Sequence, residues 1–218
     1  MKLLIVSGSQ ITPSQSAKVA DYLNQVATQF SETQHIELCR YHLPFWDGEQ
    51  ESKNDENSSW PLLSARIREA DALILITPEW GGMATPILKN FLLMCDMQEV
   101  AHKPVLLVSV VNGISGAYPI TELRMNALKN NKLVAVPDHL IIRNVEQVLN
   151  DKQSQQSKLK VTATSFEAEQ TARRDLALKE RINYSLFMLY QYSQALSSIR
   201  RQHLHSPYPK QQEYRYGM

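Results

Sequence analysis

The stretch DALILITPEWGG, residues 71–82, joins an apolar run to a carboxylate, a tryptophan and two glycines. A short continuous apolar run of this kind is typical of a strand that is buried on both faces of a parallel sheet. The next segment, TPILKNFLLMCD at 85–96, opens with a threonine and a proline that suit a helix cap and the first helical position. A buried strand followed at once by a helix indicates one unit of an alternating α/β fold.

The same alternation runs through the first two thirds of the chain. Short apolar or alternating runs predict five strands, at residues 2–8, 35–41, 71–77, 103–111 and 132–138, the last extended by 139–145. Helical spacing and capping residues predict the helices between them, at residues 15–30, 61–70, 85–96 and 114–131. The acidic stretch 47–59 is predicted to be a long surface loop. We therefore expect an open, doubly wound α/β sheet of five parallel strands in the order 2-1-3-4-5, with helices on both faces.

The last third of the chain differs from the rest in charge and pattern. Residues 1–150 carry a net charge of −4, whereas residues 151–218 carry +5. A polar linker at 150–163 leads to TSFE at 164–167, which has the pattern of a capping box. We expect a long helix to follow and to run as far as about Arg200.

We divide the chain into a domain at 1–163 and a C-terminal helix and tail at 164–218, which pack on that domain or on a partner subunit. The helix is longer than one small sheet covers, so we expect an oligomer, for which an isologous dimer is the commonest closed arrangement. The apolar helix faces around Leu186 and Leu189 are expected to contact the partner. A basic, solvated helix without a partner is the alternative.

Composition and charge bound the class of protein. With 218 residues, 43% of them hydrophobic and 21% charged, one globular domain is expected. A net charge of +1 gives no reason to expect nucleic acid as a partner, and no apolar run reaches the roughly 18 residues of a membrane span. The opening MKLLIVSG is too short for the core of a signal peptide. Cys39 and Cys95 share no motif spacing, which is typical of reduced thiols, so we expect a soluble cytoplasmic protein without a membrane partner.

The functional site is expected at one edge of the sheet. In open α/β sheets, ligands bind beyond the carboxyl ends of the strands, where the winding direction reverses. For the expected strand order, this crevice lies between the first and third strands. Three loops reach it, at residues 8–16, 77–85 and 112–118.

The first of these loops, GSQITPSQS, is rich in hydroxyl groups. Ser9, Thr12, Ser14 and Ser16 lie directly before a predicted helix, and hydroxyl and N–H groups at a helix N-terminus suit a phosphate. The loop contains neither Gly-x-Gly-x-x-Gly nor Gly-Lys-Ser/Thr, so it is neither a dinucleotide fingerprint nor a P-loop. A serine-rich helix cap without a ligand is the alternative.

The other two loops combine a flat ring with open backbone. Trp80 presents an apolar face, and Gly81 and Gly82 allow a planar ligand to approach the backbone. Glu79 is expected either to accept hydrogen bonds from loop N–H groups or to contact a neighbouring subunit. The third loop, VNGISGAY at 111–118, again places glycines at a strand end. Each loop alone also fits a rim aromatic or an ordinary turn, but together they indicate a planar cofactor with a phosphate tail and no adenylate, which describes FMN.

These motifs resemble those of the flavodoxin-like NADPH-dependent FMN reductase family, which includes small azo-dye and quinone reductases. The family opens with Gly-Ser-x-Arg-x-x-Ser-x-Asn/Ser, which reads GSQITPSQS here. It carries Thr-Pro-Glu-Tyr-Asn before a Pro-x-x-Leu-Lys-Asn helix, which reads TPEWGGMATPILKNFL here, and its later loop and helix are matched by NGISGAY and ELRMNAL. The resemblance covers about residues 1–145. It implies a flavodoxin-like fold, an FMN cofactor, NADPH or NADH as the electron donor, and a homodimer or homotetramer.

The resemblance also implies which residues contact FMN. The phosphate would be held by Ser9, Ser14 and Ser16. The edge of the isoalloxazine ring would be lined by Pro78, Glu79 and Trp80, and its far side would be covered by Gly113, Ser115 and Gly116. The other candidate cofactor-binding residues on these loops are Gln10, Ile11, Gly81, Gly82 and Asn112. No catalytic side chain and no metal ligand is expected, because the flavin carries the chemistry.

The sequence departs from the family pattern at two cofactor positions. Ile11 replaces an arginine near the phosphate, and a hydrogen bond to a charged group contributes roughly 1.5–3 kcal/mol. Gly81 replaces an asparagine near the ring. We therefore expect FMN to bind more weakly here than in typical relatives.

The function expected from these observations is electron transfer from NAD(P)H through FMN to a quinone, an azo compound, a flavin or a similar small acceptor. A flavodoxin-type electron carrier is the first alternative, with the acidic loop 47–59 as its docking surface. A non-enzymatic scaffold with a lapsed flavin site is the second. In an oligomer, Tyr208, Tyr214 or Tyr216 of the tail is expected to shield the ring of a neighbouring subunit.

Overall fold

The computed structural model describes residues 1–129, 131–150, 165–206 and 208–210. Its centre is a sheet of five parallel strands with the order β2-β1-β3-β4-β5, which confirms the predicted topology. The strands are β1 at Lys2–Ser7, β2 at Glu32–Glu37, β3 at Ala72–Pro78, β4 at Pro104–Val110 and β5 at Val134–Ile142.

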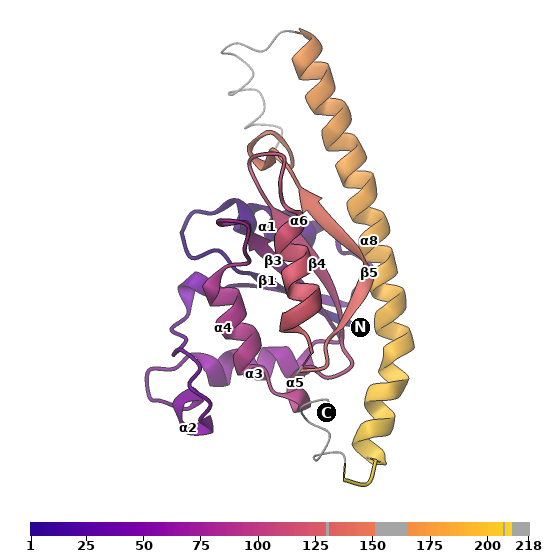
Figure 1. The fold of residues 1–218 in the computed structure, drawn as a ribbon. Coiled ribbons are helices and arrows are strands. Elements are labelled where there is room, and N and C mark those ends of the chain that lie inside the picture. Colours follow the sequence, from indigo (N-terminus) through magenta and orange to yellow (C-terminus); the bar gives the residue numbers. More distant parts are fainter. Residues whose placement is uncertain (130, 151–164, 207, 211–218) are drawn as a thin grey trace.

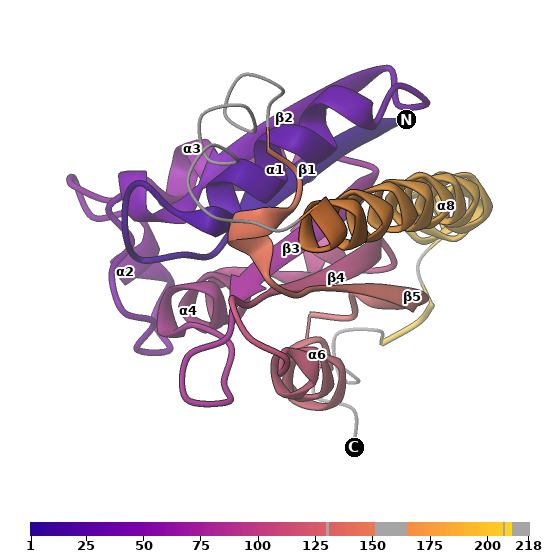
Figure 2. The same ribbon diagram turned by 90° about the horizontal axis from the view of Figure 1, so that it is seen from above.

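Helices cover both faces of the sheet (Figures 1 and 2). The main helices are α1 at Gln15–Val26, α3 at Trp60–Glu69, α4 at Pro86–Met94, α6 at Ala117–Glu122 and α8 at Ser165–His205. The short elements are η1 at Leu38–Arg40, α2 at Gln50–Lys53, α5 at Met97–Val100, the π-helical η2 at Leu123–Ala127 and η3 at Val145–Gln147.

Alternating side chains of the strands enter two separate cores. Leu4 of β1 packs with α3, α4 and α6 on one face, whereas Ile5 points to the other face, where α1 and α8 lie. Both side chains are 1% exposed or less, as the continuous apolar runs in the sequence predict. The two cores fix each strand in the sheet and so fix where its carboxyl end lies.

Several element boundaries differ from the sequence prediction. The second strand was expected at 35–41 but spans Glu32–Glu37, because it pairs residue by residue with the six-residue β1 and then turns into η1. The helix expected at 15–30 ends at Val26, since the chain turns back at Ala27 and buries Phe30.

Two further segments were predicted only in part. The loop at 47–59 contains α2, whose Lys53 is buried with its ammonium over the ring of Trp46. The helix expected at 114–131 is regular only from Ala117 to Glu122 and continues as η2. Thr164, the first residue of the predicted capping box, and residues 151–163 of the predicted linker lie outside the described residues.

The long C-terminal helix packs on its own sheet. With 41 residues α8 is about 60 Å long, and its start extends beyond the loops at the top of Figure 1. Ile182, Leu186 and Leu189 are completely buried in the core shared with α1. The expectation that the faces around Leu186 and Leu189 contact a partner is therefore wrong, since this chain's own sheet already covers them.

The packing of α8 predicts a large difference between two leucines on the same helix. Leu186→Ala removes a fully buried side chain and is expected to lower the free energy of unfolding by about 2–5 kcal/mol. Leu176→Ala removes a side chain that is 61% exposed and is expected to change it by less than about 0.5 kcal/mol. Urea unfolding of both variants measures this difference. Equal losses would contradict the packing of α8 on the sheet.

Candidate functional site

The loops that follow β1 and β3 are tied together at the carboxyl edge of the sheet. Thr85, the cap residue of α4, donates its hydroxyl hydrogen to the carbonyl oxygen of Gly8, and its own N–H bonds to Thr77 Oγ1 at 3.1 Å. The N–H of Gly8 bonds to the carbonyl oxygen of Ile76 at 2.8 Å. This is the edge at which the sequence predicts the crevice, between the first and third strands.

The loop after β1 places its three predicted phosphate-binding serines at the start of α1. Ser14 caps the helix, and its hydroxyl oxygen accepts the N–H of Ala17 at 3.0 Å. The Ser9 hydroxyl is buried and is used within the loop, in contacts of 3.3 and 3.4 Å to the backbone of Ile11. Ser16 Oγ is buried and has no hydrogen-bond partner among the described residues. Its hydroxyl thus remains available at the positive end of a helix of 12 residues.

The other predicted residues of this loop face solvent. Gln10 is exposed, and 58% of the surface of Ile11 is accessible. No side chain therefore has to move for a ligand to reach this side of the loop.

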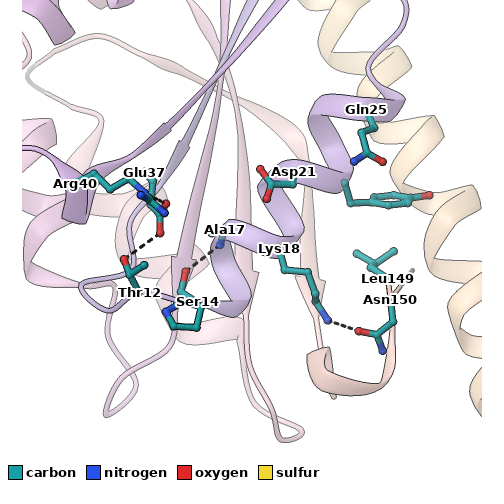
Figure 3. Close-up of a pocket in the computed structure, with 12 residues that line it drawn as sticks. Thr12, Ser14, Ala17, Lys18, Asp21, Gln25, Glu37, Arg40, Leu149 and Asn150 are labelled. Atoms are coloured by element: carbon teal, nitrogen blue, oxygen red, sulfur yellow. Dashed lines mark hydrogen bonds and ion pairs between the residues drawn. The ribbon is translucent and has the colours of Figure 1, made fainter. Parts of the chain in front are cut away.

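A cavity of about 450 Å³ lies beside this loop (Figure 3). Thr12 and Ser14 form one wall, and two cations, Lys18 and Arg40, lie on others. Lys18 Nζ donates to the carbonyl oxygen of Val145 at 2.6 Å and so closes the cavity against the segment after β5. The sequence patterns missed both cations, because Lys18 comes from the first turn of α1 and Arg40 from η1, after the end of β2.

Arg40 does not act as an isolated positive charge. Its Nε donates to the carboxylate of Glu37, which also accepts the hydroxyl hydrogen of Thr12 at 3.3 Å (Figure 3). Burial would raise the pKa of Glu37, but the hydrogen bond from Arg40 and its charge hold that pKa below the usual value. The pair is therefore ionised at neutral pH and links the end of β2 to the loop after β1.

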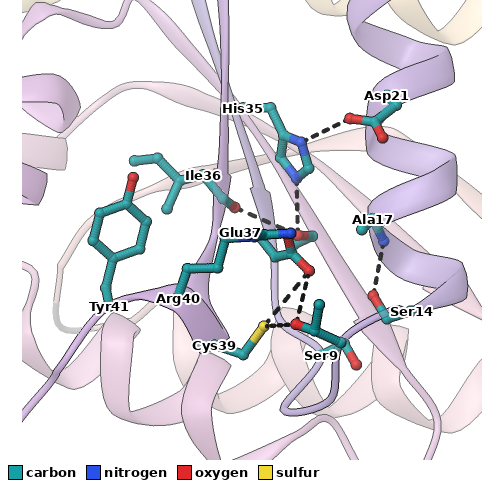
Figure 4. A network of polar contacts seen from close by, with 12 residues as sticks. Ser9, Ser14, Ala17, Asp21, His35, Ile36, Glu37, Cys39, Arg40 and Tyr41 are labelled. Carbon is teal, nitrogen blue, oxygen red and sulfur yellow. Dashed lines mark hydrogen bonds and ion pairs between the residues drawn. The ribbon is translucent and has the colours of Figure 1, made fainter.

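The same network contains a Ser-His-Asp chain (Figure 4). His35 Nε2 lies 2.9 Å from Ser7 Oγ, and His35 Nδ1 lies 3.1 Å from Asp21 Oδ1. Ser7 is completely buried within β1, so no substrate can reach its hydroxyl. These three residues tie α1 to β1 and β2 and do not form a hydrolytic site.

The loop after β3 makes a tight turn that requires glycine. Trp80 and Met83 exchange backbone hydrogen bonds of 3.1 and 3.0 Å across it. Gly81 and Gly82 have φ values of +57° and +79°, in the left-handed region that favours glycine. Trp80 is 40% exposed at the rim, and Pro78 ends the strand beside Val110 of β4. The turn therefore presents the indole ring next to open backbone.

The loop after β4 is bonded to this turn. Ser115 donates its hydroxyl hydrogen to Glu79 Oε1 at 2.8 Å, and its carbonyl oxygen accepts Arg143 Nε at 2.7 Å. Glu79 therefore accepts a hydroxyl hydrogen in this chain rather than a backbone N–H group. Its second oxygen, Oε2, is buried without a partner in the described ranges.

The fold requires glycine at one position of the third loop but not at another. Gly116 has φ +103°, and a side chain there would collide with Ile141. Gly113 has an ordinary φ, and a Cβ atom at this position would meet nothing within 4 Å. The fold itself does not require glycine at 113, and Asn112 and Gly113 are both exposed.

A carboxylate that the sequence patterns did not single out anchors the second loop. Glu122 of α6 accepts the N–H of Ala84 at 2.7 Å and pairs with Lys89 of α4 at 2.9 Å. Ala84 and Lys89 belong to the segment TPEWGGMATPILKNFL and Glu122 to ELRMNAL, and nothing in the local sequence marks these two segments as neighbours. The second loop is thus held by a carboxylate that is remote in the chain.

The strand order, the winding and this crevice define a flavodoxin-like α/β protein. A sequence profile of the NADPH-dependent FMN reductases matches residues 1–147. The chain is 28% identical to an NADPH azoreductase of Bacillus sp. strain OY1-2 over 142 residues, which is 65% of this chain and 76% of that protein. It is 29% identical to an FMN-dependent NADPH-azoreductase of Staphylococcus aureus over 154 residues, or 69% of this chain and 81% of that protein.

Solved structures with the same fold include FerB, a flavoenzyme NAD(P)H:(acceptor) oxidoreductase from Paracoccus denitrificans. It aligns with a TM-score of 0.62 at 16% identity and covers 89% of this chain and 97% of its own. An oxidoreductase from Corynebacterium diphtheriae aligns with a TM-score of 0.61 at 14% identity, covering 88% of this chain and 95% of its own. At these identities the likeness concerns the fold.

The chain belongs to the NADPH-dependent FMN reductase family. It is an oxidoreductase that uses NAD(P)H and FMN, as the sequence motifs led us to expect, and the expectation of an enzyme is confirmed. None of the helices in the described ranges combines enough length with enough apolar character to span a membrane. Nor do the side chains that the structure places include three His, Cys, Asp or Glu groups arranged to hold a metal ion.

Proposed function

We propose that FMN binds in the crevice between the loops at 8–16, 77–85 and 112–118, and that NADPH or NADH reduces it there for a small electron acceptor. The observation that carries this proposal is a set of buried polar atoms without partners among the described residues. Ser16 Oγ, Glu79 Oε2 and Ser109 Oγ all lie near the carboxyl edge of the sheet, on or beside these loops. An unsatisfied buried polar group costs about 1–3 kcal/mol, so hydrogen bonds from a bound polar ligand would offset a real penalty.

The start of α1 fits the phosphate of FMN. Ser14 and Ser16 provide hydroxyls, the first turn provides N–H groups, and the helix dipole favours an anion. Gln10 and Ile11 are exposed on the same loop, within reach of a bound phosphate. The internal bonds of Ser9 give it the role of shaping the loop.

The other two loops fit the ring. In this proposal Trp80 lines its edge, the positive-φ turn at Gly81 and Gly82 allows close approach, and the bare backbone at Gly113 covers its far side. The bond between Ser115 and Glu79 holds both loops at a fixed separation. Bound FMN supplies two-electron redox chemistry between NAD(P)H and the acceptor. This chain's residues bind and orient it and leave one face open.

The open face also indicates the kind of acceptor. In the single chain, Trp80 is 40% exposed and Ile114 is 87% exposed beside the crevice. Flat apolar molecules such as quinones and azo compounds suit such a surface. The similarity to azoreductases supports the same class of acceptor, with free flavin as a further candidate.

Purified protein is expected to bind FMN more tightly than FAD, because the site has one phosphate loop and no dinucleotide fingerprint. Titration followed by flavin fluorescence measures both affinities. The FMN-loaded protein is then expected to oxidise NADPH over many turnovers when a quinone or an azo dye is added. Tight FMN binding without turnover would contradict the proposal and favour an electron carrier. Equal or tighter binding of FAD would refute the assignment of the loops.

Ile11→Arg is expected to tighten FMN binding about tenfold, which is about 1.4 kcal/mol, because it restores a cation beside the phosphate. Ile11 is exposed, so the larger side chain fits without repacking. Riboflavin has no phosphate, and its affinity is expected to stay the same. Ile11→Gln is the neutral control and is expected to match the native protein. A similar gain for riboflavin, or for the glutamine variant, would show that position 11 does not face the phosphate.

We further propose that the protein is a homodimer or homotetramer in which a second copy covers the rim of the crevice. Apolar side chains at least 40% exposed lie on the three loops and the start of α6: Ile11, Trp80, Met83, Ile114 and Tyr118. Such a concentration of exposed apolar surface is typical of an interaction site.

Light scattering is expected to give at least twice the chain mass of 24.9 kDa for the native protein. Ile114→Glu is expected to move the mass toward that of one chain, whereas Leu176→Glu, on the outer face of α8, is not. A native mass of 24.9 kDa would contradict the oligomer.

Two further expectations remain proposals. The two cysteines, Cys39 and Cys95, are free, which supports a cytoplasmic location. Tyr208 lies at the edge of the sheet where the strands begin, opposite the proposed flavin site, so it could shield a flavin only in a neighbouring subunit. Tyr214 and Tyr216 lie outside the described residues.

A further inference from the structure

A second cavity, of about 530 Å³, lies at the opposite edge of the sheet from the proposed flavin site. Asp71 and Lys103 line it, and they directly precede β3 and β4, whereas the flavin loops follow these strands. The end of α3, the helix α5 and the last turns of α8 form the other walls. The lining residues that carry the argument are Asp71, Met97, His102, Lys103, Arg200 and His203.

Positive charges outnumber negative ones around this cavity, and both of its carboxylates are already engaged. Asp71 accepts the backbone N–H of Lys2 at 2.9 Å and pairs with Arg200 at 3.0 Å. Glu99 is 1% exposed and accepts the hydroxyl hydrogen of Ser64. Glu99 also pairs with Arg68 at 3.6 Å. The two carboxylates of the wall are therefore engaged by Arg200 and Arg68, and neither forms an ion pair with Lys103 among the described residues.

Lys103 is a buried cation whose bonding capacity is not exhausted. Its ammonium donates to the carbonyl oxygens of Ile67 at 2.6 Å and Arg68 at 3.0 Å, which uses two of its three N–H groups. Burial, and next the nearby charge of Arg200, lower the pKa of Lys103 to about 8. An anion in the cavity would compensate a charge that the protein itself leaves only partly compensated.

Two histidine rings bring the end of α8 against the start of β4. The ring centres of His102 and His203 are 4.7 Å apart, at an angle of 50°. Burial, and next His203, lower the pKa of His102, so its ring is neutral at pH 7. His203 Nδ1 is buried and has no hydrogen-bond partner in the part of the chain that the structure describes. The wall thus offers flat rings together with an unused polar atom.

The rest of the wall is mixed, since it contains the polar or charged residues Arg68, Gln98, Tyr208 and Lys210 as well as a few apolar side chains. Met97 of α5 is half-buried there, with Ala70 and Ala101 beside it. A cavity of this size, in which an apolar strip lies beside convergent polar groups, suits a small molecule. We propose that it binds a small aromatic carboxylate, with the anionic group against Lys103 and Arg200 and the ring between His203 and Met97. No described residue of the flavin loops contributes to it, so the inference does not depend on the proposed function.

Benzoate tests this proposal on the full-length, FMN-saturated protein by titration calorimetry. It is expected to bind with a Kd below about 1 mM. Benzamide, which keeps the ring but lacks the charge, and acetate, which keeps the charge but lacks the ring, are expected to bind at least tenfold more weakly. The visible flavin spectrum is expected to stay unchanged, because the cavity lies at the other edge of the sheet.

Variants locate the binding. Arg200→Gln and His203→Ala are each expected to weaken benzoate binding about tenfold, while Arg200→Lys, which keeps the charge beside Asp71, retains it within about threefold. Arg201→Gln is the matched control on an exposed neighbour outside the wall and is expected to have no effect. Thermal melting followed by circular dichroism checks that each variant is folded.

Three results would overturn the proposal. One is the absence of benzoate binding at about 10 mM benzoate, ten times the upper limit expected for the Kd. Another is equal binding of benzamide, which would remove the role of the cations. The third is a loss of binding in Trp80→Ala, with a change in the flavin spectrum, while Arg200→Gln binds normally, since this would place benzoate at the flavin face.

Discussion

The common direction of the five strands is the constraint on which the rest of this structure depends. Because all strands are parallel, every strand-to-helix loop is at one edge and every helix-to-strand connection is at the other. The chain winds first toward β2 and then back past β1 to β3, so helices leave in opposite directions at that point and a crevice opens. The bond from Thr85 to the carbonyl oxygen of Gly8 joins the loops after β1 and β3 at this edge. One cavity therefore lies beyond the ends of the strands, beside the loop after β1, and the other lies before the starts of β3 and β4.

Side chains from neighbouring elements hold the loops of the proposed flavin site, while several buried polar atoms of this region lack hydrogen-bond partners among the described residues. Glu122 and Arg143 hold the second and third loops through backbone groups, at Ala84 and Ser115. The inward-facing atoms Ser16 Oγ, Glu79 Oε2 and Ser109 Oγ have no partner among the described residues. A protein folded only for stability would pair such atoms, because leaving them unpaired costs free energy. Rigid loops with unused polar atoms are what a site needs to bind a ligand without rearranging.

The sequence predicted those elements and turns that depend on residues close together in the chain. Continuous apolar runs identified the strands, Thr85 with Pro86 identified the start of α4, and the glycine pair after β3 identified a tight turn. The second strand was misplaced because its alternation continues into η1, and only pairing with β1 ends it at Glu37. Glu122, Arg143 and the amino-edge cavity escaped prediction for a related reason. Their contacts join residues that are remote in the chain, and the role of α8 was misjudged because its apolar stripe does not say which surface covers it.

The central claim is that the three carboxyl-edge loops together form the flavin site. Backbone amide NMR of the full-length, isotope-labelled protein during titration with FMN tests it most directly. The account predicts shifts for amides in residues 8–17, 79–84 and 112–116, with none at His102 or Lys103 on the opposite edge. Shifts centred on the amino edge, or a pattern that omits two of the three loops, would contradict it.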